Sequence, residues 1–135
     1  MSRKITVVLV DDDPGGLRIM VELISREFPK VSVVTYLSGR ELMAKLDPSA
    51  LPLIIIMDYD LSRAKDWLKG DTYTKRVKTA HPGVRVIGCC ASNDAEDLAR
   101  RKNAFLSAGA DGFIEKEAGV EAFLAEIEKW LPEAL

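Results

Sequence analysis

The eight residues Val7–Pro14, VVLVDDDP, join an apolar run directly to three consecutive carboxylates. Apolar residues in succession, without alternation, are typical of a strand that is covered on both faces of a parallel sheet. Adjacent carboxylates repel one another and lose hydration wherever they are partly buried. Because this arrangement is costly, we expect a cation, backbone N–H groups or water to compensate the negative charge at the end of this strand.

Four further apolar runs predict strands, and the segments between the runs have helical spacing. The five predicted strands are Ile5–Val10, Val31–Tyr36, Leu53–Met57, Val84–Cys89 and Gly112–Ile114. Strands that alternate with helices predict a doubly wound α/β domain, in which a parallel sheet carries helices on both faces. We expect a single domain over residues 1–135, with a core of about 4–131 and no effector domain.

Capping residues and helix breakers locate the helices. Asp13 before Pro14 is a typical N-cap, and we expect the first helix to end near Phe28–Pro29. Ser38 and Glu41 have the spacing of a capping box at the start of the second helix. The remaining helices are predicted at Gly70–Ala80, between an N-cap at Asn93 and a C-terminal Gly109, and at Ala118–Leu131.

The composition excludes several classes of protein. The chain is 47% hydrophobic and 30% charged with a net charge of −2, so it lacks the basic excess of a non-specific nucleic-acid binder. We interpret the basic run Arg100–Lys102 as a solvated helix face. The apolar run Leu51–Met57 is too short to span a membrane. Cys89 and Cys90 are adjacent and would form a strained disulfide, which favours a reduced, cytoplasmic protein.

Charged residues follow three of the predicted strands. Asp11 and Asp12 follow the first strand, Asp58 follows the third and Lys116 follows the fifth. Because the carboxyl ends of parallel strands meet at one edge of a sheet, we expect these side chains to converge. Clustered carboxylates favour a hard divalent cation such as Mg²⁺. Carboxylates at helix N-termini would explain any single aspartate, but they do not explain the set together with the lysine.

Four motifs give the chain its resemblance to the receiver domain of two-component response regulators. They are VVLVDDDP at 7–14, SGREL at 38–42, IIIMDYDLS at 54–62 and AGADGFIEKE at 108–117. The resemblance covers essentially the whole chain and implies the flavodoxin-like strand order 2-1-3-4-5. It also implies that Asp58 accepts a phosphoryl group from a histidine kinase or a histidine phosphotransfer protein, in a reaction that depends on Mg²⁺.

The same resemblance implies roles for the surrounding residues. Asp11, Asp12 and Asp58 would bind the metal, together with the backbone carbonyl of Asp60. Lys116 would contact the phosphoryl oxygens. Phe113 stands where the family often has a switching aromatic ring, although an ordinary core aromatic explains it equally well.

Three departures from the family pattern affect how a phosphoryl group at the site would be coupled to the output surface. Cys90 stands where the family normally has Thr or Ser, so we expect its thiol to contact the phosphoryl group weakly and to limit the switch. Glu117 replaces the proline that usually follows the lysine. The segment Tyr59–Gly70 lacks a proline, and both it and the segment from Cys90 to Lys116 are longer than usual by about one helical turn.

The resulting hypothesis is a stand-alone signalling receiver that is not an enzyme. Its output would pass to an unidentified protein through the face of the fourth helix, fifth strand and fifth helix, with a homodimer as a further possibility and no nucleic-acid or membrane partner. A degenerate receiver that acts as an unphosphorylated scaffold is the first alternative. The Asp58-Tyr59-Asp60 motif also fits a phosphatase of haloacid-dehalogenase type. A catalytic thiol at Cys90 would need His81, the single histidine, as its partner.

Overall fold

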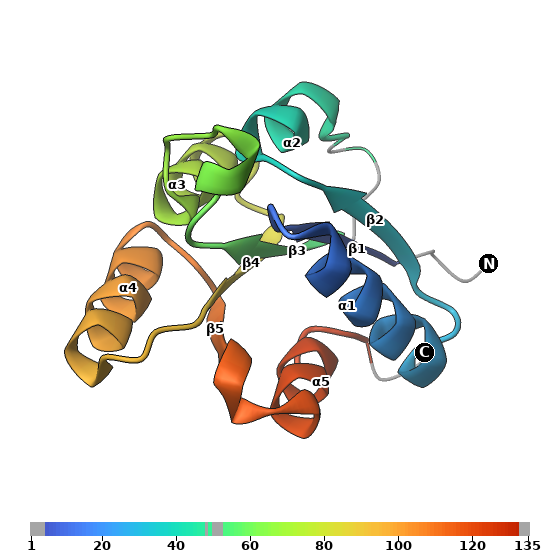
Figure 1. Ribbon diagram of the computed structural model, residues 1–135. Coiled ribbons are helices and arrows are strands. Elements are labelled where there is room, and N and C mark those ends of the chain that lie inside the picture. The colour runs from blue at the N-terminus through green and yellow to red at the C-terminus, as the bar shows by residue number, and fades with distance from the viewer. Residues whose placement is uncertain (1–4, 48, 50–52, 133–135) are drawn as a thin grey trace.

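A five-stranded parallel sheet forms the centre of the computed structural model, which describes residues 5–47, 49 and 53–132. The strands are β1 (Thr6–Val10), β2 (Ser32–Tyr36), β3 (Leu53–Asp58), β4 (Arg85–Cys90) and β5 (Gly112–Glu115). Their spatial order is β2-β1-β3-β4-β5, and every neighbouring pair is parallel. The predicted fold class and strand order are therefore confirmed (Figure 1).

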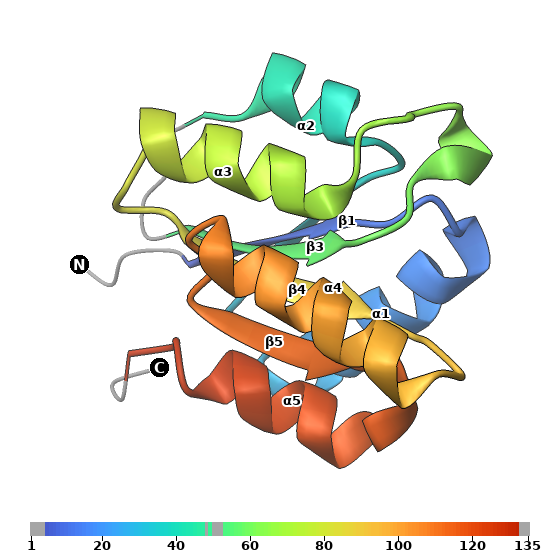
Figure 2. The same cartoon turned by 90° about the vertical axis from the view of Figure 1, so that its left-hand side faces the viewer.

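Five helices connect the strands and cover both faces of the sheet. They are α1 (Pro14–Glu27), α2 (Gly39–Lys45), α3 (Gly70–Ala80), α4 (Ala95–Ser107) and α5 (Val120–Glu128). Helices α1 and α5 lie on one face, and α2, α3 and α4 lie on the other (Figures 1 and 2). None of the helices in the described part of the chain has the length and apolar character needed to cross a membrane.

Burial on both faces of the sheet explains why the sequence of β1 does not alternate between apolar and polar residues. Val7 and Leu9 pack in the hydrophobic cluster under α1 and α5, whereas Val8 and Val10 pack in the cluster under α2, α3 and α4. Successive side chains of a strand point to opposite faces, so both sets are buried. Each fully buried aliphatic side chain contributes roughly 1.5–3 kcal/mol relative to an exposed one. This central strand therefore holds the loop that follows it in a fixed position.

Three of the predicted helix starts are confirmed, and those of α4 and α5 are displaced. Asp13 and Ser38 cap α1 and α2 as predicted, because each side chain accepts a hydrogen bond from a backbone N–H of the first turn. The predicted cap of α4 at Asn93 is wrong. Asp94 directly precedes the first helical residue, so its carboxylate is the group that reaches the N–H of Glu96, at 2.9 Å.

The last predicted helix is too long at both ends. Residues Lys116–Ala118 form a separate turn of 3-10 helix, and α5 begins only at Val120. Gly119 separates the two with a φ of 98°, a conformation that side chains disfavour and that interrupts the helix. Gly109, with a φ of 101°, ends α4 as predicted.

Candidate functional site

Asp58 is the last residue of β3, the middle strand of the sheet, and therefore lies at the carboxyl ends of the parallel strands. Its strand pairs with β1 on one side and β4 on the other, so the carboxylate is held by central strands and is only 7% exposed. The connections from β1 and β3 leave toward opposite ends of the sheet, which makes this edge the topological switch point. The structure therefore places a buried carboxylate where doubly wound sheets bind their ligands.

Two carboxylates from the loop after β1 accompany Asp58. One oxygen from each of Asp11, Asp12 and Asp58 lies within 4.8 Å of the others. Asp11 also accepts a hydrogen bond from the backbone N–H of Asp13 at 3.0 Å, and Asp12 accepts one from the N–H of Arg63 at 2.8 Å. The clustering that was predicted from the strand ends is present. A set made only of carboxylate oxygens fits a hard cation such as Mg²⁺ and not a soft metal.

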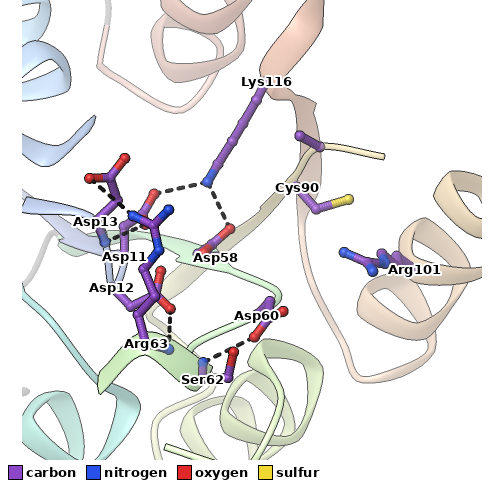
Figure 3. A pocket seen from close by; sticks show the side chains of 11 residues that line it. Asp11, Asp12, Asp13, Asp58, Asp60, Ser62, Arg63, Cys90, Arg101 and Lys116 are labelled. Atoms are coloured by element: carbon purple, nitrogen blue, oxygen red, sulfur yellow. Dashed lines mark hydrogen bonds and ion pairs between the residues drawn. The ribbon is translucent and has the colours of Figure 1, made fainter. Parts of the chain in front are cut away.

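Lys116 reaches the acidic cluster from the end of β5. Its Nζ lies 2.9 Å from Oδ2 of Asp11 and 2.9 Å from Oδ1 of Asp58 (Figure 3). Burial lowers the pKa of this ammonium group, but the two carboxylates outweigh burial and hold the pKa above its ordinary value. The lysine is therefore a permanent cation that bridges the two most buried carboxylates of the site.

The ionised form of Asp58 is disfavoured in the folded protein. Burial raises its pKa from 3.8 to about 7, and the neighbouring carboxylate of Asp11 adds to the rise, while Lys116 opposes it. Burial likewise raises the pKa of Asp12. Without a further cation the pocket holds more negative charge than Lys116 alone compensates. The site is consequently suited to gaining a metal ion.

The pocket around these groups is open and polar. It has a volume of about 310 Å³, and its walls come from the loops after β1, β3, β4 and β5 and from α4. Its lining residues are Asp11, Asp12, Asp13, Asp58, Asp60, Ser62, Arg63, Cys90, Ala91, Arg101 and Lys116 (Figure 3). A group the size of a phosphoryl group therefore has room beside the Asp58 carboxylate.

Asp60 lies at the rim of the pocket, and its side chain serves the local turn. Its carboxylate accepts a hydrogen bond from the N–H of Ser62 at 3.0 Å. The hydroxyl and N–H of Ser62 hold the pKa of Asp60 below its ordinary value. The predicted role of Asp60 concerns its backbone carbonyl, and that role stays a prediction.

Cys90 lies on the pocket wall at the end of β4. Its side chain is buried, and burial raises the pKa of the thiol, so the sulfur is protonated at neutral pH. His81 follows α3 and precedes β4, at the opposite end of the six-residue strand. Such a strand is roughly 20 Å long. A Cys–His catalytic pair is therefore excluded.

Phe113 belongs to a row of aromatic rings that starts beside the site. The ring centroid of Phe113 lies 6.0 Å from that of Phe105, which lies 6.0 Å from that of Tyr59. Phe105 fills the space beside Gly88, where a Cβ would overlap the ring. Phe113 is half-buried on β5, so the row connects the residue after Asp58 with the partly exposed face of α4 and β5.

Three residues that line the pocket or hold its surroundings in place were not predicted. Asp66 is buried and accepts hydrogen bonds from the N–H of Gly39 at 2.8 Å and the hydroxyl of Tyr73 at 2.7 Å, which fastens the long β3–α3 segment to α2. Arg63, from a turn of 3-10 helix in that segment, lies 3.5 Å from Asp13. Arg101 was interpreted as part of a solvated face, yet it lines the pocket. The length of the β3–α3 segment was the available signal for the first two.

The comparisons agree with this architecture. The family model described as "Response regulator receiver domain" matches residues 7–128. The chain thus belongs to the response regulator receiver domain family. Comparison with curated protein sequences gave no match.

Solved receiver domains share the fold at low sequence identity. The receiver domain of NtrX from Brucella abortus is 20% identical with a TM-score of 0.78, covering 93% of this chain and 97% of that one. A CheY-like response regulator receiver domain protein from Methanospirillum hungatei is 21% identical with a TM-score of 0.74, covering 95% and 93%. The BeF3-activated receiver domain of DrrB, a Thermotoga maritima protein, is 22% identical with a TM-score of 0.74, covering 93% and 95%.

Proposed function

We propose that Asp58 accepts a phosphoryl group from a histidine kinase or a histidine phosphotransfer protein, and that the modified domain signals to a separate output protein. The observation that carries the proposal is the position of the Asp58 carboxylate. It is buried at the sheet edge, 2.9 Å from the ammonium group of Lys116 and beside Asp11 and Asp12. Family membership supports the same reaction class.

The transfer is a displacement at phosphorus. An oxygen of Asp58 forms a bond to phosphorus while the bond from phosphorus to the donor's imidazole nitrogen breaks, and the imidazole leaves with the electron pair. The product is an acyl phosphate on Asp58, which water later hydrolyses. The attacking carboxylate must be ionised, and burial, which raises the pKa of Asp58, works against this. The positive charge of Lys116 favours the carboxylate form and so keeps the nucleophile available.

The surrounding groups supply charge stabilisation. Lys116 donates to the phosphoryl oxygens on which negative charge develops. Asp11, Asp12 and Asp58 would hold Mg²⁺, with the backbone carbonyl of Asp60 as a further ligand, and this ion would supply neutralisation of the transferred group. Asp12 is fixed for this purpose by the N–H of Arg63.

The output side of the proposal rests on α4 and β5. A phosphoryl group adds about −1.5 to −2 charges at one fixed place. Phe113 and Cys90 are the proposed switch residues, and the ring row Tyr59–Phe105–Phe113 leads from the acceptor toward the face of α4, β5 and α5. This face is the proposed docking surface for the output partner or for a second copy of the chain.

Intact-mass analysis tests the acceptor assignment. Wild-type protein incubated with acetyl phosphate and Mg²⁺ is expected to gain the mass of one phosphoryl group, with acetate as the leaving group. Asp58→Asn is expected to gain none. Asp60→Asn is the matched control, because it removes the same charge two residues away and is expected to be modified like wild type. Equal modification of Asp58→Asn and wild type would contradict the proposal, and an unmodified wild type would favour a degenerate scaffold.

The phosphatase alternative is not supported by the state of Asp60. A haloacid-dehalogenase mechanism uses the second aspartate of the motif as a proton donor. Ser62 holds the pKa of Asp60 below its ordinary value, so this side chain carries no proton at neutral pH.

A further inference from the structure

The guanidinium group of Arg101 forms part of the pocket wall on the side of Cys90. Arg101 lies in α4, and its side chain points into the pocket that also contains Asp58 and Lys116 (Figure 3). The side chain is 23% exposed, whereas that of its neighbour Arg100 is 65% exposed. The two arginines of this run therefore have different surroundings, and one of them faces the acidic site.

Arg101 is held near the site by weak contacts. Its guanidinium carbon lies 4.6 Å from the ring centroid of Tyr59, the residue that follows Asp58. Its Nε is buried and lies 2.8 Å from Oδ2 of Asp97 as an ion pair, without a regular hydrogen bond to any of the described residues. Asp97 thus holds the Nε side of the guanidinium group, and the same side chain also lines the pocket, where it can meet a further acceptor.

Besides Arg101, the described residues that line this side of the pocket are Cys90 and Ala91, and neither of their side chains carries a hydroxyl group. Cys90 offers a thiol, which is a weak hydrogen-bond donor. Lys116 lies against Asp11 and Asp58, at 2.9 Å from each, on the opposite side of the acceptor (Figure 3).

We propose that Arg101 is a phosphoryl-binding residue, whose guanidinium group donates to an oxygen of the phosphoryl group on Asp58 on the side where Cys90 provides only a thiol. The inference rests on the proposed function and deepens it. A planar guanidinium fork matches phosphate oxygens well, and the added charge of the phosphoryl group competes with Asp97 for it. Because Arg101 belongs to α4, binding of the phosphoryl group acts directly on that helix.

Beryllofluoride binding in the presence of Mg²⁺ tests the inference, since its fluorine atoms stand in for the phosphoryl oxygens on the acceptor carboxylate. Arg101→Ala is expected to weaken beryllofluoride binding roughly tenfold, the low end for a charge-assisted hydrogen bond. Arg100→Ala is the matched control, because it removes the same side chain and another partner of Asp97 outside the pocket, and we expect its affinity to equal that of wild type. Arg101→Lys, which keeps the charge but loses the fork, is expected to fall between Arg101→Ala and wild type.

The Nε–H signals of the arginines give a second readout. In wild type the signal of Arg101 is expected to shift on addition of beryllofluoride, while that of Arg100 stays in place. Equal affinity of Arg101→Ala and Arg100→Ala, with an unmoved Arg101 signal, would overturn the inference while leaving Asp58 as acceptor. A wild type that binds no beryllofluoride would overturn the proposed function and this inference together. Melting temperatures establish that each variant is folded. If Arg101→Ala is unfolded, the comparison is made between Arg101→Lys and wild type.

Discussion

Replacing Asp58 with asparagine is expected to stabilise the metal-free protein at pH 8. The wild-type carboxylate is 7% exposed and lies beside Asp11 and Asp12, so its ionisation in the folded state is opposed by lost hydration and by like charge. Asparagine has nearly the same shape and carries no charge. Its amide oxygen can still accept a hydrogen bond from Lys116, which keeps its contact with Asp11.

The size of the effect follows from the pKa of Asp58. A rise from 3.8 to about 7 corresponds to about 4 kcal/mol, at about 1.4 kcal/mol for each pH unit. This value is an upper limit, because water and rearrangement of the pocket relieve part of the cost. We therefore expect Asp58→Asn to increase the free energy of unfolding by about 2 kcal/mol at pH 8.

The pH dependence has a definite sign. Between the unfolded pKa of 3.8 and the folded value of about 7, the folded protein binds more protons at Asp58 than the unfolded chain does. Stability contributed by the protonated carboxyl is thus present at low pH and is lost as the pH rises through this window. The difference between the variant and wild type is expected to be small at pH 4 and to grow until about pH 7.

Urea denaturation in the presence of EDTA at several pH values measures this difference. Asp60→Asn is the control, since the pKa of Asp60 is lowered and removal of its charge is not expected to stabilise the fold. Mg²⁺ is expected to reduce the advantage of Asp58→Asn, because the ion binds the wild-type carboxylates in the folded state. A variant no more stable than wild type at pH 8, or a gain that does not change with pH, would refute the reasoning.

Three further changes are expected to have measurable effects. Asp12→Asn should weaken Mg²⁺ binding, read as a smaller rise of the melting temperature with added Mg²⁺; an unchanged rise would exclude Asp12 as a ligand. Cys90→Thr should tighten beryllofluoride binding and enlarge the amide shifts of α4 and β5, since a hydroxyl is a better donor than a thiol; equal shifts at saturation would show that the thiol does not limit the switch. Asp66→Ala should lower the free energy of unfolding by about 2–3 kcal/mol in urea denaturation, because buried donors including the Tyr73 hydroxyl lose their acceptor; an effect below about 1 kcal/mol would contradict this anchoring role.

The fold could be predicted because the three central strands, β1, β3 and β4, are buried on both faces. Val7–Val10 and Ile54–Met57 are apolar without interruption, and the helices between the strands have separate caps and breakers. The errors occurred at helix ends, where neighbouring residues compete for the same role. Asn93 and Asp94 are both good caps, and only the position of the first helical turn decides between them.

The site was predictable to the extent that its residues follow strands. Asp11, Asp58 and Lys116 converge because the strands are parallel and their carboxyl ends therefore lie at the same end of the sheet. Arg101 and Asp66 could not be found in this way. Arg101 sits inside a helix, and its direction depends on how α4 packs on the sheet. Asp66 is buried only because its long segment returns to the start of α2.

Cys89 and Cys90 both lie in the interior, and burial raises the pKa of each thiol. Buried, protonated thiols react slowly with maleimides, and the sequence contains no other cysteine. A cysteine introduced at exposed Lys102 on α4 is therefore expected to take up a fluorophore or spin label without removal of the native pair. With a second label at exposed Arg18 on α1, the distance between the two labels would measure how far α4 moves when beryllofluoride and Mg²⁺ are added.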